Sequence, residues 1–145
     1  EEPGNFKVPF GMNQAELIEA AGGYKVDPEK IISGGPMMGF SMFTVDVPVT
    51  KTSSSILCFT KDEVAQYEPT ACINCGRCVE VCPSRLIPSR LADYAEHHDE
   101  EAFTKHEGLE CMECGSCSYV CPAKRQLKQA IGSMRKTALA NRKKK

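Results

Sequence analysis

The sequence predicts an α+β protein made of two parts, a small mixed N-terminal domain and a helical, cysteine-rich C-terminal domain. Three observations support this division. Residues 1–62 combine one helical segment with short apolar runs typical of strands, residues 71–122 repeat one cysteine pattern twice, and residues 123–145 carry apolar side chains at helical spacing. We therefore expect one domain over residues 1–62 and a second over residues 63–145.

The N-terminal domain begins with a predicted helix over residues 13–21, because its first residue is an asparagine that can act as N-cap and Gly22-Gly23 can end it. Short strands are expected at residues 30–33 and 55–59, which are rich in apolar side chains. Residues 45–51 alternate weakly and contain a proline, which favours an edge strand. One helix with a few short strands makes a small α+β module.

A glycine-rich turn and a lone cysteine complete this domain. The string from Gly34 to Gly39 lacks both the Gly-Lys-Ser/Thr ending of a phosphate loop and the pattern of a dinucleotide loop, so it predicts a tight turn that exposes Met37 and Met38. Cys58 lies in a short apolar run. Because free cysteine packs as a small hydrophobe, we expect Cys58 to be a buried core thiol rather than a ligand.

The other eight cysteines form two copies of Cys-x2-Cys-x2-Cys-x3-Cys-Pro. The first copy comprises Cys72, Cys75, Cys78 and Cys82, and the second comprises Cys111, Cys114, Cys117 and Cys121. This spacing is the bacterial signature for cubane clusters, so the sequence predicts two [4Fe-4S] clusters and one-electron chemistry. A glycine follows the second cysteine of each copy, where a missing Cβ lets the backbone approach the inorganic core.

In two-cluster proteins of this kind, the last cysteine of each motif binds the other cluster. The expected ligand sets are therefore crossed. The first cluster is assigned to Cys72, Cys75, Cys78 and Cys121, and the second to Cys111, Cys114, Cys117 and Cys82.

Other uses of these cysteines fit the pattern less well. A structural zinc site takes four ligands, usually as two separated Cys-x2-Cys pairs, and has no use for a third cysteine three residues on. Disulfides are disfavoured because nine is an odd number and nothing marks the chain as secreted. His97, His98 and His106 lack metal-ligand spacing to the motifs, so we expect solvated surface histidines.

The segments between and after the two cysteine copies predict helices. Ser89 can cap one helix and Asp99 a second one, which is expected to end at Gly108. The last segment has apolar residues at spacings of four, three and four, which predicts one buried stripe on a C-terminal helix. This stripe consists of Leu127, Ile131, Met134 and Ala138.

Charge and hydropathy limit the kinds of partner that the sequence predicts for this chain. Residues 61–122 carry twelve acidic and five basic side chains, whereas residues 123–145 carry nine basic and none acidic. We interpret the basic tail first as a solvated helix, with a role in docking to a partner as the alternative. No apolar stretch approaches the ~20 residues of a membrane helix, and no aromatic-rich basic surface suggests nucleic-acid binding. The chain is therefore expected to have no transmembrane segment of its own.

Two strings together resemble the C subunit of the Rnf-type ion-translocating electron transport complex. The first is Ile32-Ser33-Gly34-Gly35-Pro36-Met37-Met38-Gly39, and the second is the cluster region with its Cys72-to-Cys78 and Cys111-to-Pro122 motifs. The resemblance implies a soluble-ligand-binding β-grasp domain followed by a helical ferredoxin-type domain. It also implies a peripheral subunit on the cytoplasmic face of a membrane complex that moves electrons between ferredoxin and NAD.

The same resemblance limits what this chain is expected to do alone. The family's FMN and NADH site lies in an N-terminal domain that this sequence does not contain, so the chain is expected to relay electrons rather than oxidise NADH. Its expected partners are other subunits of the complex and ferredoxin or flavoprotein electron carriers. Two alternatives remain open: part of a cobalamin-reducing flavoprotein of propanediol-utilising microcompartments, and a metal-stabilised docking module.

Overall fold

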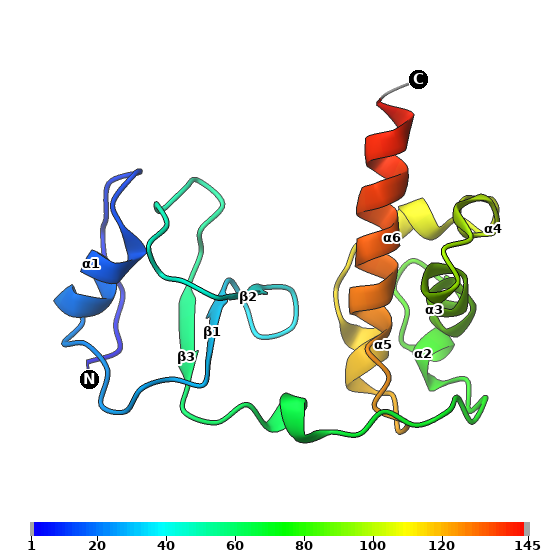
Figure 1. Ribbon diagram of the computed structural model, residues 1–145, viewed down its shortest axis with the longest axis horizontal. Helices are drawn as coiled ribbons and strands as arrows, with labels where there is room; N and C mark the ends of the chain where they lie inside the picture. Colours follow the sequence, from blue (N-terminus) through cyan, green and yellow to red (C-terminus); the bar gives the residue numbers. More distant parts are fainter. Residues whose placement is uncertain (1, 144–145) are drawn as a thin grey trace. The chain divides into compact units, whose positions relative to one another are not determined.

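The computed structural model describes residues 2–143 and divides into two compact units, Glu1–Gln66 and Tyr67–Lys145, each of which is described by itself (Figure 1). The division falls after Gln66 rather than after residue 62. Asp62 explains the difference, because its carboxylate accepts from Lys30 Nζ at 2.9 Å and from the Ala65 N–H at 3.3 Å. The hydrogen bond from Lys30 lowers the pKa of Asp62.

The first unit holds a helix and a three-stranded antiparallel sheet, which confirms the expected α+β class. The elements in chain order are α1 (Gln14–Ala20), β1 (Lys30–Ser33), β2 (Phe40–Met42), β3 (Ile56–Phe59) and the short 3-10 helix η1 (Glu63–Gln66). The strand order is β2-β1-β3, so β1 lies in the middle and Ile31 pairs with both Met42 and Cys58.

The predicted start and end of α1 are confirmed. The Asn13 side chain accepts from the Ala15 N–H at 2.9 Å, which makes it the N-cap. The helix is followed by Gly22 at φ 89° and Gly23 at φ 75°, and the Gly23 N–H returns to the Ile18 carbonyl at 2.9 Å. Both glycines adopt the left-handed backbone that ends many helices.

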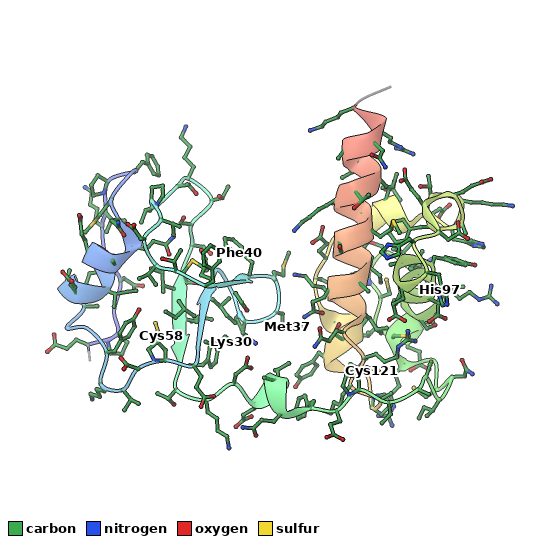
Figure 2. All side chains as sticks on the ribbon, in the orientation of Figure 1. Lys30, Met37, Phe40, Cys58, His97 and Cys121 are labelled. Atoms are coloured by element: carbon green, nitrogen blue, oxygen red, sulfur yellow. The ribbon has the colours of Figure 1, made fainter. Side chains whose placement is uncertain are left out.

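Two expectations for this unit are wrong. Residues 45–51 form no strand and contribute only an isolated bridge between Asn13 and Pro48, whereas the edge strands of the sheet are β2 and β3. Cys58 is exposed on β3 rather than buried (Figure 2). An apolar run predicts a strand, but which of its side chains are covered depends on the elements that pack against the sheet.

The turn from Gly34 to Gly39 connects β1 to β2. Its methionines, Met37 and Met38, are exposed as predicted, and Met37 is labelled in Figure 2. The Gly39 N–H donates to the Gly35 carbonyl at 2.8 Å. A Cβ on Gly39 would lie 2.5 Å from the Gly35 oxygen and from Ile32 Cγ2. Glycine is therefore required at the point where the turn closes onto the strand.

The second unit is helical. Its elements are α2 (Arg77–Glu80), α3 (Pro88–Glu96), α4 (Glu100–Lys105), the 3-10 helix η2 (Gly108–Glu110), α5 (Ser116–Tyr119) and α6 (Leu127–Arg142). Helix α6 is the longest and lies against α3 (Figure 1). Its predicted apolar stripe is confirmed, because Leu127, Ile131, Met134 and Ala138 are all buried. No helix among the described residues is both long and apolar enough to cross a membrane.

The ends of two helices differ in part from their prediction. Ile87 rather than Ser89 occupies the N-cap of α3, because Pro88 takes the first helical position, where its missing N–H costs nothing. Asp99 caps α4 as predicted and accepts from the Ala102 N–H at 2.9 Å. Helix α4 ends at Lys105, before Gly108, which begins η2.

Candidate iron–sulfur centres

The eight motif cysteines line two hollows in the second unit, in two groups of four. The first hollow is lined by Cys72, Cys75, Cys78 and Cys121, and the second by Cys82, Cys111, Cys114 and Cys117. Each hollow thus takes three cysteines from one copy of the motif and one from the other. The two hollows therefore contain the same two groups of four cysteines as the crossed ligand sets expected from the sequence.

Each hollow brings four thiols of the chain together. A [4Fe-4S] cluster is bound by four cysteines that each reach a different corner of a larger core. The donor set and its arrangement therefore fit cubane clusters.

The backbone of the two motif copies is nearly the same. Gly76 and Gly115, at φ 76° and 83°, precede the four-residue helices α2 and α5. The residue two positions before each glycine is also left-handed, Asn74 at φ 54° and Glu113 at φ 55°. These turns wrap the first three cysteines of each copy around its hollow, and the short helix that follows leads to the fourth cysteine.

The thiols of the second hollow differ in their burial and in the direction of their pKa shifts. Burial raises the pKa of Cys117 to about 11, and it also raises the pKa of the half-buried Cys111. Hydrogen bonding from Ser116, whose Oγ lies 3.5 Å from Cys114 Sγ, lowers the pKa of Cys114. Since only thiolates bind iron, cluster insertion must release protons from this site.

Backbone N–H groups point at two of the sulfurs in the second hollow. The Leu86 N–H donates to Cys82 Sγ and the Glu113 N–H to Cys111 Sγ, both at 3.4 Å. Hydrogen bonds to ligand sulfurs are one of the factors that set the reduction potential of a cluster.

The two hollows differ in their exposure to solvent. Cys72 and Cys75 are exposed, and Ile73, which lies between them in the sequence, is 65% exposed. In the second hollow Cys117 is buried, and the apolar side chains of Leu91 and Ile131 line the wall. The first site is therefore the more accessible of the two.

Two arginines that sequence reasoning missed form ion pairs near these hollows. Arg125 donates to Asp93 at 2.8 Å and to Glu96 at 2.9 Å, both on α3. Arg135 on α6 donates to the Glu113 carboxylate at 3.3 Å. The basic character of the tail was visible in the sequence, but the partners lie at least twenty residues away along the chain, so no local pattern identifies them.

The remaining candidate residues lie outside the hollows. His97, His98 and His106 are exposed as predicted. His97 Nδ1 lies 2.7 Å from the Asp93 carbonyl oxygen, and the His106 ring stacks on Tyr94 with the ring centroids 5.1 Å apart.

Cys58 lines a cavity of about 850 Å³ in the first unit together with Gln14. Gln14 is buried and its Oε1 has no hydrogen-bond partner among the described residues. An unpaired buried oxygen costs about 1–3 kcal/mol, so the core of the first unit is incomplete at this point.

Comparison with known proteins matches both units. The family model of the 4Fe-4S dicluster domain matches residues 71–125, and that of the SLBB domain matches residues 1–41. The dicluster match covers all eight motif cysteines. The chain therefore carries a domain for two [4Fe-4S] clusters, in agreement with the cofactor prediction.

Three relatives are C subunits of ion-translocating oxidoreductase complexes. The C subunit of the Na(+)-translocating ferredoxin:NAD(+) oxidoreductase complex of Acetobacterium woodii is 42% identical over 144 residues, which is 99% of this chain and 32% of that protein. The corresponding protein of the proton-translocating complex of Clostridium ljungdahlii is 47% identical over 92 residues, 63% of this chain and 20% of that protein. The C subunit of the ion-translocating oxidoreductase complex of Methanosarcina acetivorans is 45% identical over 89 residues, 61% of this chain and 20% of that protein.

The chain thus spans about a third or less of the length of these relatives. Its match to the first of them extends over nearly every residue and includes both of its domains. The chain is therefore similar to the C subunits of these ion-translocating oxidoreductase complexes, and it contains regions that match the SLBB domain and the 4Fe-4S dicluster domain.

Proposed function

We propose that this chain is the electron-relay part of a membrane-associated, ion-translocating ferredoxin:NAD oxidoreductase complex and passes single electrons through two [4Fe-4S] clusters. The observation that carries the proposal is the sorting of eight cysteines into two hollows, each with four thiols from both motif copies. The names of the relatives supply the kind of complex. In this role the chain is part of an oxidoreductase and ion translocase.

The proposed ligands follow the two hollows. Cys72, Cys75, Cys78 and Cys121 bind the first cluster, and Cys111, Cys114, Cys117 and Cys82 bind the second. Because each cluster draws its fourth ligand from the opposite motif, the two ligand loops are tied together by the short segments that contain Cys82 and Cys121. Crossed ligands keep two clusters adjacent within one small helical unit.

A [4Fe-4S] cluster held by these thiolates would supply reversible one-electron transfer. The residues of this chain supply the thiolates, orient the loops and limit water. Leu91 and Ile131, each 1% exposed, form the dry wall beside the second site. The glycines at the start of α2 and α5 let the backbone pass close to each core.

The partners and the location belong to the same proposal. Other subunits of the membrane complex would hold this chain as a peripheral component on the cytoplasmic face, with ferredoxin or a flavoprotein carrier as electron partner. The names of the relatives and the need of eight free thiols for a reducing compartment support this assignment. The accessible first site, with Cys72 and Cys75 exposed, offers a short route for exchange with such a partner.

Anaerobic reconstitution of the chain with iron and sulfide tests the proposal. We expect about eight irons per chain and two centres that are reduced reversibly in a potentiometric EPR titration. Cys58→Ala is the matched control, because Cys58 lies outside both motifs and its loss should leave iron content and signals unchanged. Bound zinc, or iron that cannot be reduced, would instead indicate a metal-stabilised docking module.

A further inference from the structure

Arg135 contacts the chain on both sides of one ligand cysteine. Its Nε donates to the Leu109 carbonyl at 2.9 Å, and its Nη1 lies 3.3 Å from Glu113 Oε1. Leu109 and Glu113 precede and follow Cys111 by two residues each. A single guanidinium on α6 therefore contacts the chain on both sides of Cys111, at the start of the second ligand loop.

Packing supports the same placement of Glu113. Its side chain lies over Gly132 of α6, where a Cβ would come within 3.0 Å of Oε2. Glu113 is only 23% exposed and Arg135 31% exposed, so the pair is partly shielded from water. An ion pair in this setting is screened less than one on the open surface. The small residue at position 132 gives the carboxylate its room beside the helix.

The first ligand loop has no such arrangement. Asn74 occupies the position that corresponds to Glu113 and is neutral, exposed and left-handed in the same way. Its Oδ1 lies 3.8 Å from Cys72 Sγ. Among the described residues, no ion pair ties the first loop to a helix. The two loops share a backbone but differ in charge and in attachment.

We propose that Arg135 is a positioning residue for the second cluster, which fixes the loop around Cys111 and compensates the Glu113 charge beside it. The inference rests on the proposed function, since it takes the second hollow as a cluster site. Net charge and hydrogen bonds near the sulfurs set the potential of a cluster. Without Arg135, an uncompensated carboxylate would remain next to the second site, and reduction of that cluster would become harder.

The test compares Arg135→Gln with Lys136→Gln in the reconstituted chain. Both variants remove one positive charge from α6, but Lys136 is exposed and lies one residue away from the contact. The expected result is a more negative potential for one centre in Arg135→Gln, with the other centre unchanged and no shift in Lys136→Gln. The affected centre is identified as the one that Cys114→Ser removes. Equal shifts of both centres, or no shift, would overturn the proposal.

Glu113→Gln provides a second, independent readout. This variant removes the compensated charge, so the same centre should shift to a more positive potential, and Asn74→Asp should shift the other centre to a more negative one. If Arg135→Gln does not fold, the direction and the centre affected by Glu113→Gln decide the question. Failure of the wild-type chain to bind eight irons would refute the proposed function itself, which separates the two results.

Discussion

After Cys82 the chain turns through a left-handed Arg85 and enters the nine-residue helix α3 at Pro88. After Cys121 it turns through a left-handed Lys124 and enters the sixteen-residue helix α6 at the corresponding position, Leu127. The two halves of the cluster unit therefore repeat in backbone path, from the first cysteine to the start of the following helix. The two halves differ in the contacts that the following helix makes with its own ligand loop.

The longer helix reaches back over its own ligand loop. Arg135 of α6 contacts Leu109 and Glu113, whereas α3 ends at Glu96 and the first loop remains exposed around Ile73. A repeated motif thus produces two hollows that are each lined by four cysteines but have different surroundings. Electron relays require such a difference when two clusters are to have different potentials, because spacing alone makes them alike.

The largest effect is expected from the cysteines that cross between the halves. Cys121→Ser should remove the same EPR centre as Cys75→Ser, and Cys82→Ser the same centre as Cys114→Ser, with iron falling from about eight to about four per chain. The physical reason is the sharing of each hollow by both motif copies. Iron analysis and EPR of the four variants check this. If Cys121→Ser removed the centre that Cys114→Ser removes, the ligands would not be crossed.

The next effect concerns the core that both halves share. Leu91 of α3 and Ile131 of α6 are each 1% exposed, so truncation to alanine should destabilise the chain by about 2–5 kcal/mol in either case. Anaerobic denaturant unfolding of the reconstituted protein measures the loss, with the exposed Lys136→Ala as control. A loss below about 1 kcal/mol for one of the two would show that the halves do not depend on a common core.

A smaller and equal effect is expected where the halves are most alike. Gly76→Ala and Gly115→Ala place a Cβ on residues with φ 76° and 83°, which costs about 1–2 kcal/mol each. Gly35→Ala is the control, because its backbone is not left-handed and no atom lies within 4 Å of the added Cβ. Thermal unfolding under anaerobic conditions compares the three. A clear inequality between Gly76 and Gly115 would contradict the repeat in backbone geometry.

The smallest effect tests a contact that exists in one half only. Arg125 stands where the first half has the buried Leu86, and it pairs with Asp93 and Glu96, which are about half exposed. Arg125→Gln should lower the free energy of unfolding by only about 0.2–1 kcal/mol for each ion pair removed. Since salt screens exposed charges, the loss should shrink at high ionic strength. Arg90→Gln, an exposed change on α3, is the control, and a loss independent of salt would point to packing instead.

The amino-acid sequence by itself determined the parts of this protein that depend on near neighbours. Asn13 and Asp99 cap their helices because each side chain reaches an N–H two or three residues ahead. The cysteine spacing predicted the cofactor because three ligands of a cluster come from one short loop. The stripe from Leu127 to Ala138 is buried because helical periodicity places these residues on one face.

Tertiary structure decided the features that depend on distant residues. Strand β2 and the exposure of Cys58 follow from which sides of the small sheet are covered, and an apolar run carries no information about that. Ser89 is not the N-cap of α3, because Pro88 occupies the first helical position, which suits proline. Arg125 pairs with carboxylates of α3, and Arg135 pairs with Glu113 of the second ligand loop. Each pair joins residues more than twenty positions apart, so only the folded chain brings them together. Three of the four thiols at each hollow come from one local motif, whereas the fourth thiol and the difference between the two hollows arise from contacts that folding alone creates.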